Sequence, residues 1–248
     1  MVKRFTYNWL VGILVLKDLS KNLFFLMSRL FRLTTTRECR VLTPIGWGAL
    51  LVVFCSIMAS TTLFVYPFLA PTKPVGGEIL VVERWLPDYA LEKVKEQFQK
   101  GNYRLLVIVG RKLERGHPLE QYKNSANWMV SKFKDRGIPE GKIMPISVNK
   151  PLKKDRTYHK ALLVQKKLDE IGLTEISIDV VSLGAHARRT WFLFEKVFSP
   201  VSVGVVSIMP IGYNTSRWWL SSAGVRSVIS ESIAYLYARF IFSPPIKN

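Results

Sequence analysis

The sequence predicts an α/β protein with a mostly parallel, five-stranded sheet, helices on both faces of that sheet, and one membrane-spanning helix before it. Between residues 78 and 209, short runs of Val, Ile and Leu alternate with longer segments of helical periodicity. Strands that alternate with helices in this way form a parallel sheet between two helical layers. A second observation predicts the membrane helix, because residues 41–72 contain no charged side chain. A chain of 248 residues has room for one globular domain of about 150 to 200 residues besides this helix.

Residues 1–44 are expected to lie at the inner face of a membrane. Two apolar segments, residues 5–16 and 23–33, are separated by Lys17, Asp18 and Lys21 and are too short to cross a bilayer. Their mixture of aromatic and basic residues favours amphipathic helices in the membrane interface. A single re-entrant or poorly ordered arm is the alternative.

Residues 45–70 form the predicted transmembrane helix, because they can cross a hydrocarbon core of about 30 Å. A signal peptide is disfavoured, since the run begins far from the N-terminus. Residues 1–72 carry 8 basic and 2 acidic side chains, all before the span, and the positive-inside rule then predicts a cytoplasmic N-terminus. We therefore expect a single-pass protein of the bacterial inner membrane, with residues 71–77 as a linker and residues 78–248 as an extracytoplasmic domain.

The part of the chain after the span is also basic, since residues 73–248 contain 28 basic and 16 acidic side chains. This surplus would attract anionic lipid headgroups, anionic polymers or phosphorylated substrates. Nucleic acid is not expected as a partner of an outward-facing domain. Cys39 and Cys55 lie at the edge of the span and within it, which excludes a disulfide framework and a cysteine metal site in the outer domain.

The first half of the domain follows the breakers Pro74, Gly76 and Gly77. Residues 78–83 predict a buried strand, and residues 87–101 a helix with proline at its start and glycine past its end. Residues 105–110 are an equally apolar second strand. The helical spacing of apolar residues in 119–136 predicts the second helix, which the sequence Gly137-Ile138-Pro139 ends.

The second half begins with a short strand, residues 142–146, whose Pro145 indicates either a sheet edge or an early end of the strand. A helix over 157–171 follows. Residues 176–183 are a buried strand that ends at Gly184, where the chain turns into the helix 185–198. Residues 201–209 complete the sheet. The apolar helix 222–242 either packs on the domain or returns to the membrane surface, and the sequence leaves both open.

The candidate catalytic residues follow the strand ends, because ligands of open α/β sheets bind outside the carboxyl ends of the strands. His186 stands at a helix start after the buried strand 176–183. There it would act as a general base or a hydrogen-bond donor, with a structural histidine as the alternative. Glu83 and Asp88 follow the first strand and would supply a second acid or base. They are equally explained as strand-end and helix-start charges.

The candidate ligand-binding residues lie at the other strand ends and favour an anion. Arg189 and Arg111 would clamp it with planar guanidinium groups, while the adjacent Arg188 diverges on its helix towards the surface. The full predicted set is Gly110, Arg111, Asp155, Arg156, Thr157, Gly184 and Arg189. The alternative for Asp155 is a helix N-cap. Trp218 and Trp219 form either a lid over the crevice or an interfacial anchor.

No pair of histidines has metal-ligand spacing, so no metal site is predicted. The sequences typical of dinucleotide, P-loop and α/β-hydrolase sites are also absent. The cofactor therefore stays unassigned.

Residues 77–209 resemble the YdcF/SanA/ElyC domain. The resemblance rests on the strand 79–82, on the helix that precedes Gly137-Ile138-Pro139, on Thr157, and above all on the family's H-x-x-R pair at His186 and Arg189. It implies a Rossmann-like fold and a role in envelope or surface-polymer biology, through a nucleotide-like or lipid-phosphate ligand.

The chain departs from this family at four positions of the motifs. The family glutamate is Ser125, two family asparagines are Arg156 and Lys160, and the second glycine of a Gly-Gly pair is Arg111. Positive charge has thus entered where the family carries neutral or acidic groups.

The sequence therefore leads to two functional hypotheses. The first is a membrane-anchored envelope protein whose outer domain binds, and as an enzyme would process, a phosphorylated or anionic metabolite or lipid-linked precursor. Its partners would be membrane lipids and that ligand. The alternative is a non-enzymatic membrane scaffold for envelope or surface-polymer assembly. The sequence does not decide whether the protein is an enzyme.

Overall fold

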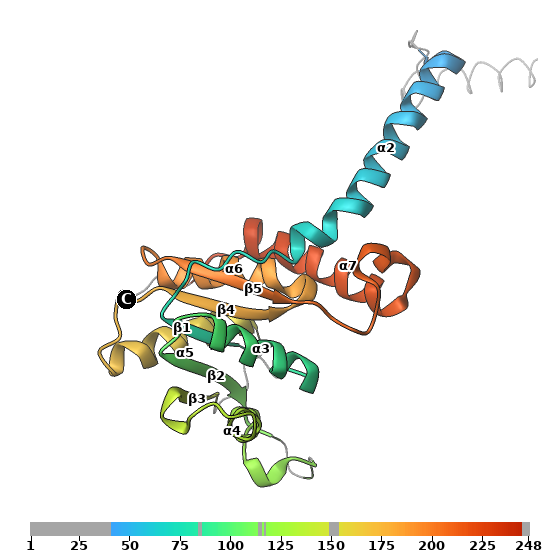
Figure 1. The fold of residues 1–248 in the computed structure, drawn as a ribbon. Coiled ribbons are helices and arrows are strands. Elements are labelled where there is room, and N and C mark those ends of the chain that lie inside the picture. Colours follow the sequence, from blue (N-terminus) through green and yellow to red (C-terminus); the bar gives the residue numbers. More distant parts are fainter. Residues whose placement is uncertain (1–40, 84–85, 114–115, 117, 149–153, 245–248) are drawn as a thin grey trace, which may run out of the picture. The chain divides into compact units, whose positions relative to one another are not determined.

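The computed structural model describes residues 41–83, 86–113, 116, 118–148 and 154–244 (Figure 1). The chain forms two compact units, residues 1–54 and 55–248. The interfacial helices predicted over 5–16 and 23–33, together with Cys39, lie outside the described residues.

Helix α2, Pro44–Leu69, is long and apolar enough to cross a membrane. Its 26 residues carry no charge and correspond to a length of about 39 Å at 1.5 Å per residue. Most of its side chains are exposed, whereas Tyr66 and Leu69 near its C-terminal end are buried. The prediction of one long apolar helix over 45–70 is confirmed within one residue at either end.

The sheet contains the five predicted strands, all of them parallel. They are β1 (Ile79–Val82), β2 (Leu105–Arg111), β3 (Ile143–Val148), β4 (Ile178–Leu183) and β5 (Val203–Ile208), in the spatial order β3-β2-β1-β4-β5. Strand β3 lies at an edge, as Pro145 predicted, because a residue without an N–H group is tolerated where one side of the strand has no partner.

Helices cover both faces of this sheet (Figure 1). Successive side chains of a strand point to opposite faces, so Ile79 and Val81 pack with α5 (Arg156–Glu170) and α6 (Ala187–Phe198). Leu80 and Val82 pack with α3 (Asp88–Lys100) and α4 (Ser125–Asp135). The α/β fold class is therefore confirmed.

Three predicted helices differ from the structure at their ends. The segment predicted as a helix over 119–136 is a 3-10 turn, Glu120–Tyr122, followed by α4, because Lys123 has a positive φ of 64° and Asn124 caps the new helix. Residues Gly184–His186 form a 3-10 turn before α6. The last helix, α7, covers Ser222–Leu236 and continues as a π-helical turn, Tyr237–Ile241.

The segment predicted as a linker, residues 71–77, is tied to the sheet by a buried carboxylate. Asp179 on β4 is fully buried and accepts hydrogen bonds from the backbone N–H groups of Val75 (2.8 Å) and Gly77 (3.0 Å) and from the Tyr103 hydroxyl (2.8 Å). Lys73 also pairs with Val205 through two backbone hydrogen bonds. The chain after α2 is therefore held along β4 and β5.

We expect the Asp179→Ala variant to lose about 3 kcal/mol or more of folding free energy, because three donors lose their acceptor, at about 1 to 3 kcal/mol for each group left unsatisfied. Tyr103→Phe removes one of the three hydrogen bonds to Asp179 and also the one that the hydroxyl accepts from Gln97, so it should cost about 1 to 2 kcal/mol. Denaturant unfolding of the full chain in detergent measures both. The exposed Asp169→Ala is the control, and an equal loss in that variant would contradict the assignment.

Candidate functional site

The candidate site lies where the strand order reverses. From β1 the chain moves through β2 to β3 on one side, and β4 and β5 follow on the other side. The carboxyl ends of β1 and β4 therefore flank the topological switch point, which is the usual position of ligand sites in open α/β sheets. Glu83 follows β1, and the turn Gly184–His186 follows β4.

Gly184 permits this turn. Its φ is +53°, and a Cβ atom there would lie 3.1 Å from the Cδ of Pro210. An L side chain would therefore be strained and crowded at this point. The glycine identified in the sequence thus positions His186 and lies close to Pro210 of the pocket described below.

The two predicted catalytic residues His186 and Glu83 are in contact. His186 Nε2 lies 2.9 Å from Glu83 Oε1, and both side chains are buried. Lys160 donates from Nζ to the Glu83 backbone carbonyl at 2.6 Å and to Glu83 Oε2 at 3.1 Å. The buried carboxylate therefore has a cation beside it.

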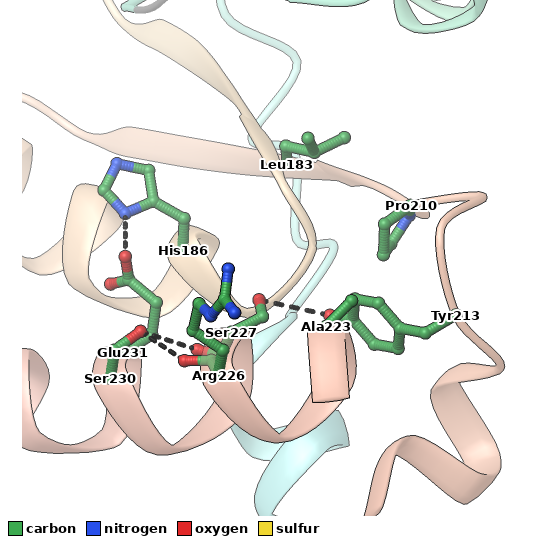
Figure 2. Close-up of a pocket in the computed structure, with 9 residues that line it drawn as sticks. All are labelled: Leu183, His186, Pro210, Tyr213, Ala223, Arg226, Ser227, Ser230 and Glu231. Atoms are coloured by element: carbon green, nitrogen blue, oxygen red, sulfur yellow. Dashed lines mark hydrogen bonds and ion pairs between the residues drawn. The ribbon is translucent and has the colours of Figure 1, made fainter. Parts of the chain in front are cut away.

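Glu231 on α7 completes the cluster from the opposite side of the imidazole ring. Its Oε1 lies 3.0 Å from His186 Nδ1, the pair drawn in Figure 2. Arg189 donates to both oxygens of this carboxylate, from Nε at 2.9 Å and from Nη2 at 3.1 Å. The predicted pair His186 and Arg189 is therefore brought together, but the fork of Arg189 faces a glutamate of the same chain.

The imidazole has no nitrogen available as a base in this arrangement. A ring that carries two protons donates to both carboxylates. A ring with one proton donates from Nε2 to Glu83, while Nδ1 accepts from Arg189 Nη2, which lies 2.9 Å away. Both proton counts leave each nitrogen engaged, so the geometry favours binding or structural support over proton transfer.

The charges around Glu231 set its protonation. Burial would raise the pKa of this carboxyl, but hydrogen bonds and charges from His186 and Arg189 lower the pKa to about 2. Glu231 is therefore ionised at neutral pH, and each of the two glutamates of the cluster stands beside a cation.

A pocket of about 360 Å³ opens beside the cluster (Figure 2). Its lining comes from the ends of β4 and β5 and from one face of α7: Leu183, His186, Pro210, Tyr213, Ala223, Arg226, Ser227, Ser230 and Glu231. The guanidinium group of Arg226 has no hydrogen bond or ion pair with any other residue that the structure describes. Ser227 accepts a hydrogen bond from the Tyr213 hydroxyl at 3.2 Å, so its own proton is free to be donated.

Several other predicted site residues contact different parts of the domain. Asp88 is exposed and pairs with Arg136 at 2.6 Å. Gly110 packs closely against the backbone of Ala126, and the backbone N–H of Arg111 donates to the Ser125 hydroxyl at 3.0 Å. These contacts fix the start of α4.

The predicted cluster at the start of α5 is only indirectly linked to the site. Asp155 stands at the N-cap with a positive φ of 47°, yet its side chain makes no capping hydrogen bond. Arg156 is exposed, whereas Thr157 is buried one helical turn before Lys160. Among the described residues, no hydrogen bond or ion pair joins these three side chains to His186 or its two glutamates.

Arg188 and Trp218 hold the end of α2. Arg188 donates from Nε to the Phe68 carbonyl at 2.7 Å, and its guanidinium lies 4.4 Å from the Phe68 ring. Trp218 is buried and donates from Nε1 to the Thr62 carbonyl at 3.0 Å. Trp218 is therefore an anchor between helices and does not line the pocket as a lid would.

Sequence reasoning missed Glu231 and Arg226 and treated Lys160 only as a departure from a family pattern. One signal was present, because Glu231 is the only acidic residue in 196–248 and stands in an otherwise apolar helix. Among the described residues, no group of three or more His, Cys, Asp or Glu side chains is arranged to hold a metal ion.

The lowered pKa of Glu231 predicts a pH-dependent stability. The pKa of the Glu231 carboxyl falls from 4.5 to about 2 on folding. Its ionised form therefore stabilises the domain by about 3 kcal/mol above pH 4.5, and this stabilisation is lost as the pH falls towards 2. The Glu231→Gln variant should therefore be less stable than the wild type at pH 7, with less than half of this difference left at pH 3.

Denaturant unfolding of the full chain in detergent at pH 7, 5 and 3 measures this difference. Glu96→Gln, which removes only an exposed pair with Lys93, should change stability by less than about 1 kcal/mol. A Glu231→Gln deficit that stays constant with pH would show that the carboxylate charge is not what stabilises the cluster.

The geometry of the site has no counterpart among known proteins that could assign it a role. No family model matches the sequence, and no curated protein or solved structure shows significant similarity to it.

Proposed function

We propose that α2 anchors this protein in a membrane and that its α/β domain binds a phosphate-bearing or otherwise anionic ligand in the pocket beside His186. Arg226 is the observation that carries the proposal. Its guanidinium lines the pocket and has no ion-pair partner among the described residues.

The charges of the site support an anion. Lys160 neutralises Glu83, and Arg189 neutralises Glu231, both at hydrogen-bonding distance. The charge of Arg226 therefore has no anionic partner among the described residues. A phosphate that enters the pocket would meet this cation without first breaking an ion pair. The guanidinium fork matches two phosphate oxygens, and the Ser227 hydroxyl offers a third donor nearby.

The proposed activity is binding. Both ring nitrogens of His186 already face carboxylates, so the ring orients Glu231 and the pocket wall. Arg189 supports the same carboxylate through two hydrogen bonds and does not act as the anion clamp.

A non-enzymatic scaffold is the second candidate function. It is favoured by the same saturated cluster, because contacts that join β1, α5, α6 and α7 stabilise the domain without any ligand. In that case alanine substitutions in the pocket would leave function intact, whereas changes at Trp218 would abolish it.

The membrane attachment and cellular location are part of the proposal. The 8 basic residues before the span support a cytoplasmic N-terminus and an extracytoplasmic domain at the bacterial inner membrane. The His186 and Arg189 motif of the YdcF/SanA/ElyC resemblance supports a role in the envelope, with a phosphorylated metabolite or lipid-linked precursor as ligand.

The Arg226→Ala variant should bind inorganic pyrophosphate at least tenfold more weakly than the wild type. A hydrogen bond to a charged group contributes about 1.5 to 3 kcal/mol, and 1.4 kcal/mol corresponds to a factor of ten. Isothermal titration calorimetry of the full chain in a neutral detergent measures the affinity.

Arg217→Ala is the matched control, since Arg217 is exposed outside the pocket lining. It should bind pyrophosphate as the wild type does. Equal affinities of wild type and Arg226→Ala would refute the assignment of the pocket.

Orientation is tested by a reporter fused after Asn248. Alkaline phosphatase, which is active only outside the cytoplasm, should be active in this fusion. Green fluorescent protein fused at the same position should not fluoresce. The opposite pattern would place the domain in the cytoplasm and overturn the proposed location.

A further inference from the structure

Helix α7 carries a row of exposed apolar side chains. Val225, Ile229, Ile233 and Leu236 recur every three or four residues, and their exposed fractions run from 39% to 63%. Residues at this spacing share one side of a helix. Phe240 and Ile241 follow in the π-helical turn and are more than 70% exposed. We call this surface the α7 apolar face.

The pocket lies on the neighbouring side of the same helix. Arg226 and Ser230 each follow a residue of the apolar face by one position, which turns them about 100° around the axis, and both line the pocket. Val228 lies on another side of α7, where it is buried against the end of α2. The apolar face therefore borders the side of α7 that carries Arg226.

The end of α2 packs against a neighbouring side of α7 inside the compact unit 55–248. The rings of Phe68 and Tyr235 lie 5.4 Å apart, and Tyr66 and Leu69 share a buried cluster with Val228. Leu63, Phe64 and Phe68 are exposed apolar side chains at this end of α2.

We propose that the α7 apolar face lies in the interface of the bilayer that α2 crosses, so that the pocket takes the phosphate headgroup of a membrane lipid. The inference rests on the membrane anchor of the proposed function. A lipid surface is the occupant that the structure favours. The row is apolar, the helix that carries it packs against the membrane helix, and Arg226 borders it, as in helices that lie at a membrane surface. Exposed apolar patches of this kind are uncommon on soluble monomers.

Nitroxide labels in the full chain test the position of the apolar face. In a background of Cys39→Ser and Cys55→Ser, single labels are introduced by Ile233→Cys, Ile57→Cys on α2 and Lys166→Cys on α5. The protein is reconstituted in vesicles of phosphatidylglycerol and phosphatidylcholine. Labels at positions 233 and 57 should collide more with oxygen than with a water-soluble nickel chelate, and the label at 166 should show the reverse.

Each alternative result overturns a different statement. Position 233 in water with position 57 in the bilayer would refute the α7 inference and leave the anchor intact. Position 57 in water would refute the anchor and with it the α7 inference. A label at 233 that neither reagent reaches would show that a protein, such as a second copy of the chain, covers the face.

The source of the phosphate is tested with phosphatidic acid added to the detergent-solubilised protein and detected by native mass spectrometry. The wild type and Arg217→Ala should retain at least tenfold more lipid adduct than Arg226→Ala. Pyrophosphate binding that depends on Arg226 without any such adduct would reject the lipid headgroup and preserve the anion pocket. Equal adducts in all three proteins would reject Arg226 as its ligand.

Discussion

The buried carboxylate of Glu83 is the constraint on which the site depends. Removing an ionised group from water costs several kcal/mol unless charged or hydrogen-bonding partners replace the solvent. Here Lys160 and His186 supply those partners from α5 and from the turn after β4. The imidazole in turn faces Glu231, which draws α7 against the carboxyl ends of the strands. One buried charge thus specifies how three separate parts of the chain meet.

This arrangement changes the role of Arg189. The H-x-x-R spacing places His186 and Arg189 on one side of the helix start, as expected of residues three apart. The guanidinium of Arg189 nevertheless contacts Glu231 twice and His186 Nδ1 once, and Arg226 on α7 is the cation that faces the pocket without a partner among the described residues. Arg189 therefore fixes a carboxylate, and through it the imidazole, whereas the charge available to a ligand belongs to the neighbouring helix.

The features that the sequence predicts correctly are those that local pattern determines. Alternating apolar runs and helical periodicity predicted all five strands, and Pro145 predicted the edge because a missing N–H group is a local property. The contacts of Glu231 and Arg226 depend instead on where α7 folds back. The hydrogen bond between His186 and Glu231 joins residues 45 positions apart. No periodicity encodes that distance. Asp179 did carry a signal, since a carboxylate within an apolar strand requires buried donors, but the sequence does not specify that Val75, Gly77 and Tyr103 supply them.

Three side chains of α7 make their contacts in the same orientation of the helix about its axis. Val228 faces the buried cluster with the end of α2, Glu231 faces His186, and Arg226 faces the pocket. A rotation of α7 would withdraw Glu231 from His186 and Arg189 and expose Val228, so these polar contacts and the apolar packing select the same orientation. That orientation leaves Val225, Ile229 and Ile233 outside. The exposed apolar face is therefore a geometric consequence of building the pocket, and a surface that covers it would stabilise the arrangement that presents Arg226.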